Sequence, residues 1–137
     1  MARPVFLAAP ERGAGALALV EALLREIQVA TGGALKGSDV FVPHLQVGDP
    51  GVDVEASAYF QRSLEALQEA RVVVAVLDGP QADEGVAFLL GYAFAAGKPV
   101  IGYATDGRAK GPFSEGACAE VVHDVRGLVA ALGRALL

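Results

Sequence analysis

Three carboxylates lie close together in the sequence, around a turn that follows the most apolar run of the chain. Asp78 comes directly after residues 72–77, and Asp83 and Glu84 come a few positions later. Carboxylates accept hydrogen bonds from ligand hydroxyls, and they act as nucleophiles in covalent catalysis. They also have structural uses, because Asp favours turns and caps helices. A cap carboxylate opposes anion binding at a helix N-terminus, so the pattern favours a neutral polyol ligand over a phosphate.

The elements around these carboxylates are predicted to be a strand, a helix and a second strand. Residues 72–77 are an unbroken apolar and mostly β-branched run, which is typical of a parallel strand buried on both faces. Asp83 stands where the N-cap of a helix would lie, and Gly97 stands where that helix would end. Residues 100–103 supply the next strand, and ligands of such sheets bind beyond the carboxyl ends of the strands. We therefore place a candidate site there, made of Asp78, Gly79, Pro80, Asp83 and Glu84.

The rest of the chain repeats this alternation of strands and helices. Further strands are expected at residues 3–9, 40–44 and 120–123, and apolar residues recur at helical spacing between them, as at Leu17, Val20, Leu24 and Ile27. Five alternating strands predict an α/β fold: a three-layer, doubly wound, flavodoxin-like five-stranded parallel sheet in the order 2-1-3-4-5. With 137 residues, 53% of them hydrophobic, the chain is predicted to form one domain over residues 1–137.

Two polar residues outside the central unit are further candidates for the site. His44 is expected at the carboxyl end of the second strand, where it would hydrogen-bond a ligand or donate a proton to a leaving group; an ordinary strand-end histidine is the alternative. A helix is expected over residues 57–70, with Phe60, Leu64 and Leu67 on its apolar face. Ser63 lies one position from that face and is either a buried polar edge or part of a pocket lining.

Composition and charge exclude several classes of partner. The net charge is −5 and the basic residues are scattered, which disfavours a nucleic-acid surface. No apolar run is long enough to cross a membrane and no signal-peptide core follows Met1, so a cytoplasmic location is expected. His44 has no second ligand at metal-binding spacing and Cys118 has no partner, so neither a metal site nor a cofactor is expected.

A short glycine pattern raises one alternative function. Gly13, Gly15 and Ala18 match G-x-G-x-x-A, which cradles a pyrophosphate in dinucleotide-dependent oxidoreductases. Here the glycines follow a Pro-Glu-Arg turn instead of a strand, and no acidic residue ends the second strand to hold a ribose. Small residues that let a helix approach the sheet are the favoured interpretation.

Several short motifs, taken together, resemble the nucleoside 2-deoxyribosyltransferase family. Members of that family transfer deoxyribose between nucleobases, or hydrolyse the N-glycosidic bond, through a covalent intermediate on a Glu. The resemblance implies a nucleoside pocket with Phe6 and Pro10 at its floor, and a homodimer or larger homo-oligomer whose pockets are completed in trans. The motifs are Val5-Phe6-Leu7-Ala8-Ala9-Pro10, Asp78-Gly79-Pro80, Asp83-Glu84-Gly85, Leu90-Gly91-Tyr92-Ala93, Gly97-Lys98-Pro99 and Gly102-Tyr103.

The chain departs from the family at the positions that carry the chemistry. The nucleophilic Glu of the family lies six positions after the Asp that starts the helix, and Leu89 stands there. The carboxylate that orients it is replaced by Ser63, and residues 111–113 replace a family Asn or Ser that is lent across a subunit interface. Asp83 matches the sugar-contacting Asp of the family. Glu84 is either a relocated nucleophile or a complement to the helix dipole.

Two functions are therefore the leading predictions. One is a deoxyribosyltransferase or N-glycosidase that uses Asp83 or Glu84 as its catalytic carboxylate. The other is a nucleoside- or nucleotide-binding protein that keeps the pocket, with Leu89 in its lining, and lacks the chemistry. The dinucleotide-dependent oxidoreductase is the third and weakest.

Overall fold

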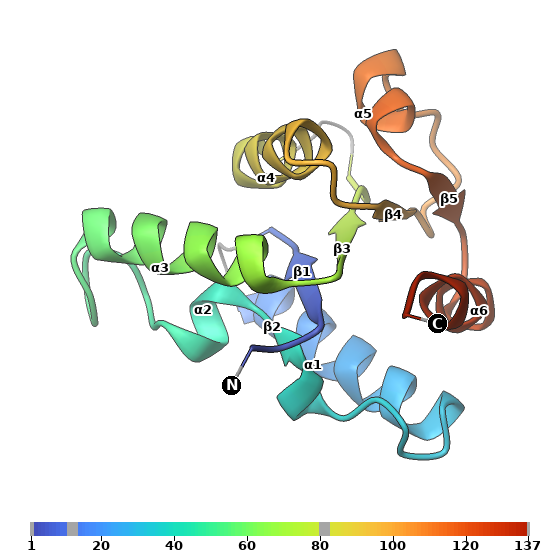
Figure 1. Ribbon diagram of the computed structural model, residues 1–137, viewed down its shortest axis with the longest axis horizontal. Coiled ribbons are helices and arrows are strands. Elements are labelled where there is room, and N and C mark those ends of the chain that lie inside the picture. The colour runs from blue at the N-terminus through green and yellow to red at the C-terminus, as the bar shows by residue number, and fades with distance from the viewer. Residues whose placement is uncertain (1, 11–13, 80–82, 137) are drawn as a thin grey trace.

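The computed structural model describes residues 2–10, 14–79 and 83–136. In these ranges five parallel strands form one sheet in the order β2-β1-β3-β4-β5, with helices on both faces (Figure 1). This confirms the predicted doubly wound, flavodoxin-like architecture. The strands are β1 (Val5–Ala8), β2 (Val40–Phe41), β3 (Val72–Val76), β4 (Val100–Tyr103) and β5 (Glu120–Val122). The helices are α1 (Ala14–Ala30), the 3-10 turn η1 (Gly37–Asp39), α2 (Pro43–Gln46), α3 (Ala56–Glu69), α4 (Glu84–Ala95), α5 (Pro112–Ala117) and α6 (Val125–Leu136).

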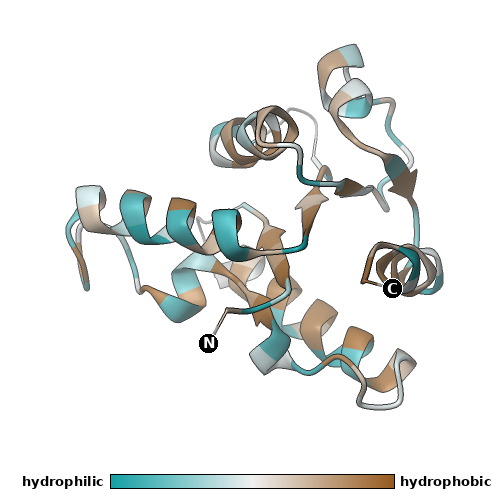
Figure 2. Cartoon of the chain, in the orientation of Figure 1, coloured by the Kyte–Doolittle hydropathy of each residue, from teal (hydrophilic) through white to brown (hydrophobic). Residues whose placement is uncertain are grey.

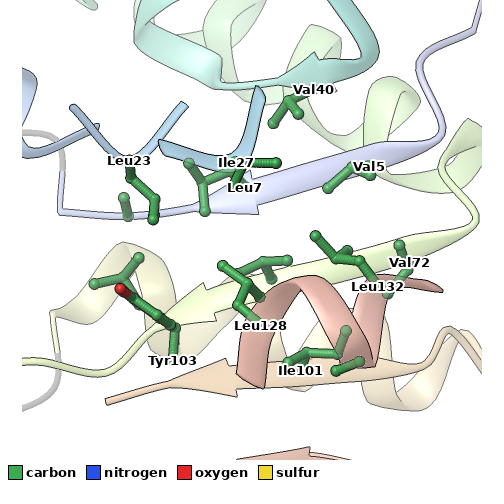
Figure 3. Packing of buried hydrophobic residues seen from close by; sticks show 14 of the residues in the cluster. Val5, Leu7, Leu23, Ile27, Val40, Val72, Ile101, Tyr103, Leu128 and Leu132 are labelled. Atoms are coloured by element: carbon green, nitrogen blue, oxygen red, sulfur yellow. The ribbon is translucent and has the colours of Figure 1, made fainter. Parts of the chain in front are cut away.

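Alternating residues of the central strands build two separate hydrophobic cores. All residues of β1 and β3 are buried, and Figure 2 shows both strands as hydrophobic throughout. Val5 and Leu7 face α1 and α6, where Leu23 and Leu128 cover them (Figure 3). Phe6 and Ala8 face the other side of the sheet, toward α3 and α4. Each fully buried Val, Leu or Phe contributes about 1.5–3 kcal/mol to the stability of the sheet.

β4 contains a glycine because neighbouring side chains occupy the space beside it. A Cβ at Gly102 would lie 2.9 Å from Leu77 Cδ1 and 3.0 Å from Cys118 Sγ. Real Cβ atoms do not approach other heavy atoms that closely, so the residue cannot carry a side chain unless these two move. Gly102 thus lets Cys118, at the end of α5, pack directly on the sheet.

The second strand ends earlier than predicted. β2 contains only Val40 and Phe41, and Pro43 starts helix α2. Proline cannot donate a ladder hydrogen bond but is well suited to the first turn of a helix. The Val42 N–H then bonds the side-chain oxygen of Gln46 within α2. His44 consequently lies in a helix instead of at the end of a strand, which corrects the prediction.

The buried face of α1 also differs from the predicted one. Val20, Leu23 and Ile27 are buried, whereas Leu17 is 36% exposed. The helix is rotated slightly, so that Leu23 faces the sheet and Leu24 is only partly covered. Within the described ranges, no helix is both long and apolar enough to cross a membrane.

Candidate functional site

A cavity of about 430 Å³ lies between α3 and α4, next to the carboxyl edge of the sheet. The residues that α4 contributes come from its first turns, directly after β3 and the loop that follows it. A volume of this size suits a small-molecule ligand. The lining consists of Pro50, Ala56, Tyr59, Phe60, Ser63, Leu64, Glu84, Gly85, Phe88 and Leu89.

The α3 wall carries the buried serine of the site. Ser63 is 4% exposed, and its Oγ has no hydrogen-bond partner among the described residues. Tyr59 and Leu67 lie one turn away on either side and are buried with it. The predicted apolar face was therefore wrong at Phe60, which is half exposed and packs on Phe88 of α4 with ring centroids 5.7 Å apart. Ser63 stands within the buried face and lines the cavity, which unites its two predicted roles.

The α4 wall brings Glu84 and Leu89 to the same cavity. Glu84 is exposed in the first turn, and Leu89 is 7% exposed one turn and a half further along. Ser63 and Leu89, which the family resemblance places at its two carboxylate positions, thus both line this cavity. Among the described lining residues, Glu84 supplies the carboxylate.

Asp83 is the N-cap of α4. Its Oδ1 accepts hydrogen bonds from the backbone N–H groups of Gly85, at 3.0 Å, and Val86, at 3.1 Å. These are orphan donors of the helix start, so the capping role considered in the sequence is observed. The same carboxylate occupies the donors that a phosphate would need, and its charge repels an anion. Asp83 does not belong to the cavity lining.

Asp78 and Gly79 connect two loops at the carboxyl edge of the sheet. The Asp78 carboxylate accepts hydrogen bonds from the Thr105 backbone N–H, at 2.6 Å, and from its hydroxyl, at 2.7 Å. The Gly79 N–H donates to Asp106 Oδ2 at 2.7 Å, and Lys110 Nζ donates to Asp106 Oδ1 at 2.8 Å. The Lys110 hydrogen bond, followed by that from Gly79, holds the pKa of Asp106 well below its usual range. We call Asp78, Gly79, Thr105, Asp106 and Lys110 the loop clasp.

Three other candidate residues lie away from the cavity. Phe6 is completely buried and stacks on Phe41 with ring centroids 5.6 Å apart, so it belongs to the core. Pro10 is half-buried two residues after the end of β1, and His44 is half-buried in α2. None of the three lines the cavity between α3 and α4. Pro80 and Gly13 lie outside the described residues.

The described lining of the cavity differs from the site of a retaining glycosidase in its carboxylates. A retaining glycosidase holds two carboxyl groups about 5 Å apart across the scissile bond. Here the described lining holds the carboxylate of Glu84 together with an aliphatic side chain, a hydroxyl and aromatic rings. In the part of the chain that the structure covers, no cluster of three or more His, Cys, Asp or Glu residues is placed to hold a metal ion.

The chain has a flavodoxin-like α/β fold with a cavity, the candidate ligand site, next to the carboxyl edge of its sheet. The family model for nucleoside 2-deoxyribosyltransferase matches residues 5–131, and the chain belongs to that family. The resemblance seen in the short motifs is thereby confirmed. No curated protein matches the chain.

Solved structures share this fold at low sequence identity. A conserved protein from Enterococcus faecalis V583 superposes with a TM-score of 0.78 at 20% identity, covering 98% of this chain and 99% of that one. A 2-deoxyribosyltransferase from Bacillus psychrosaccharolyticus gives 0.73 at 20% identity, covering 91% and 89%. The CMP N-glycosidase BcmB of Clostridium botulinum gives 0.56 at 15% identity, covering 94% and 97%.

Proposed function

We propose that the protein binds a nucleoside-class ligand in the cavity between α3 and α4 and does not transfer its sugar. One observation carries this proposal: Ser63 and Leu89, at the positions of the two family carboxylates, both line that cavity. A leucine supplies neither a nucleophile nor an ion partner for an oxocarbenium-like transition state. Membership of the family supports the ligand class.

Glu84 motivates a second candidate, an N-glycosidase or transferase with a relocated nucleophile. Its carboxylate lines the same cavity as Ser63 and Leu89. It lies in the first turn of α4, where a negative charge also complements the helix dipole. The helix dipole alone accounts for a carboxylate at this position, without a catalytic role. Binding without turnover is therefore the function that we propose first.

Incubation with several 2'-deoxynucleosides and a different free base separates these two candidates. We expect a nucleoside to raise the melting temperature while chromatography shows neither a new nucleoside nor a released base. Turnover that is retained in Glu84→Gln would point to another group, and turnover that is lost in that variant would establish Glu84 as the nucleophile. Either kind of turnover would overturn the binding-only proposal. Failure of any nucleoside to bind would overturn both candidates.

We also propose that the protein forms a homodimer or larger homo-oligomer through the outer side of α4 and α5. Phe94 and Phe113 are 62% and 91% exposed there, and a groove of about 440 Å³ runs between the two helices. Large apolar side chains gathered on one surface favour association. The family resemblance, in which pockets are completed by a neighbouring subunit, supports the same expectation.

A further inference from the structure

We infer that the cavity between α3 and α4 takes the planar, uncharged base of its ligand and leaves the sugar outside. This inference rests on the proposed nucleoside-binding function and specifies which part of the ligand the cavity recognises. With a carboxylate pair at residues 63 and 89, the cavity would hold the sugar. We assign the base to the cavity instead.

The apolar surface of the cavity suits a ring better than a polyol. Leu89 is 7% exposed, and Phe60 and Phe88 are in contact beside it. A sugar hydroxyl placed against these side chains would lose water without gaining a partner, which is unfavourable. The faces of a nucleobase are apolar and stack on aromatic side chains, so they give up no hydrogen bonds to water when they enter the cavity.

Ser63 supplies the polar contact that the edge of a base requires. Its Oγ is buried without a partner in the described residues, and the residue lines the cavity. A buried hydroxyl without a hydrogen bond is unstable, and a ligand that bonds it removes that cost. A hydroxyl both donates and accepts, which matches the adjacent donors and acceptors on a base edge.

Glu84 selects for neutral ligands with a donor. It lines the cavity, and an ionised carboxylate only accepts hydrogen bonds. A ring N–H or amino group therefore suits it, whereas a phosphate is repelled. The Asp83 carboxylate already holds the Gly85 and Val86 N–H groups at the start of α4, which removes the usual anion donors.

Calorimetry with four kinds of probe tests the inference: free bases such as adenine and cytosine, their 2'-deoxynucleosides, 2-deoxyribose, and the nucleoside monophosphates. We expect a free base to bind within about threefold of its nucleoside, because a sugar outside the cavity adds little contact. Deoxyribose alone should not bind, and the monophosphate should bind more weakly than the nucleoside. A nucleoside that binds tenfold or more tightly than its base, or binding of deoxyribose, would overturn the inference and leave the proposed function intact. If neither bases nor nucleosides bind, the proposed function itself fails.

Ser63→Ala provides a readout that a structural role would not give. It should weaken base binding about three- to tenfold, the range of one neutral hydrogen bond. It should also leave the ligand-free melting temperature unchanged or higher, because it removes an unpartnered buried hydroxyl. Ser57→Ala, at an exposed position of the same helix, is the matched control and should change neither quantity. Unchanged base affinity in Ser63→Ala would contradict the proposed contact.

Discussion

At residues 63 and 89, a hydroxyl and an alkyl group occupy the two places where the family resemblance implies carboxylates. A single carboxylate left at residue 89 would face aromatic and aliphatic neighbours and lose its hydration without a partner. Removing both charges avoids that cost and leaves the smaller cost of one unpartnered hydroxyl at Ser63. The pair is therefore best understood as one change, which a double variant should reverse.

The double variant Ser63→Asp with Leu89→Glu restores both family carboxylates to the cavity. We expect base exchange between deoxynucleosides to rise from undetectable to measurable, because the carboxylate pair would hold the sugar in the cavity in place of the base and the new Asp would orient the new Glu. Chromatography of the products measures this directly, and near-native melting behaviour checks that the variant folds.

The neutral pair Ser63→Asn with Leu89→Gln matches the double variant in size and polarity. It should show no exchange, because an amide cannot form the glycosyl intermediate. Exchange activity in this pair would mean that another carboxylate performs the reaction. No exchange in the acidic variant, with ligand still bound, would mean that the cavity geometry itself differs from that of the transferases.

The loop clasp leads to a pH prediction at Asp106. Hydrogen bonds from Lys110 and Gly79 lower its pKa from the ordinary 3.8, so its stabilising contribution is complete above 3.8 and disappears only as the pH falls through the lower folded value. Carbon NMR should show the Asp106 carboxyl still ionised at about pH 3, where an ordinary aspartate is mostly protonated. Lys110→Met should move this titration back up toward 3.8. Titration of the native protein at the ordinary value would contradict the observed contacts.

At the scale of the element, helix α4 depends on its cap to present Glu84 and Leu89 to the cavity. Asp83→Ala leaves two backbone donors without their carboxylate, and should lower the free energy of unfolding by about 1 kcal/mol. Urea denaturation measures this change, and ligand affinity should fall with it as the first turn frays. Asp83→Asn keeps a capping oxygen and should cost less; an equal loss in both variants would show that charge, not capping, stabilises the helix start.

The sequence predicted regular elements better than their ends and faces. The continuous apolar run of β3 and the Asp83 cap of α4 were sufficient to locate the central unit, and the alternation of five strands with helices predicted the strand order. The end of β2 was predicted wrongly because Pro43 can follow a strand or begin a helix. The hydrogen bond from the Val42 N–H to the Gln46 side chain favours the helix. The packing of α3 against its neighbours buries Tyr59 and leaves Phe60 half exposed against Phe88, and no single-helix pattern contains that information.

The site was predictable only in part for the same reason. Spacing from Asp83 placed Leu89 and Ser63, and the structure brings both to one cavity. The aromatic wall of Phe60 and Phe88 was not anticipated, because it forms between two helices. The sequence predicts Asp78 as a ligand-binding carboxylate. In the structure Asp78 accepts hydrogen bonds from Thr105 and from the backbone N–H of Asp106, within the loop clasp.

At the scale of the whole molecule, the outward side of α4 and α5 is the surface where self-association is expected. Phe94→Glu with Phe113→Glu should shift the protein from oligomer to monomer in analytical ultracentrifugation, because each charge would have to be buried at the contact. The melting temperature at low protein concentration should change little, since both side chains are exposed.

Val29→Glu is the control for this surface. Val29 is 81% exposed on α1, which covers the opposite face of the sheet, so a charge there should leave the sedimentation coefficient unchanged. If the unmodified protein sediments as a monomer across a wide concentration range, the oligomer proposal is wrong.

The close approach of Cys118 to Gly102 gives the chain an internal reporter. Burial, assisted by the Glu115 charge, raises the pKa of this thiol to about 11, so roughly one molecule in ten thousand carries the reactive thiolate at neutral pH. The sulfur also donates a hydrogen bond to the Ser114 carbonyl. Because it is the one cysteine in the sequence and is partly exposed, its alkylation rate in native buffer would report how accessible the thiolate is at the contact between α5 and β4.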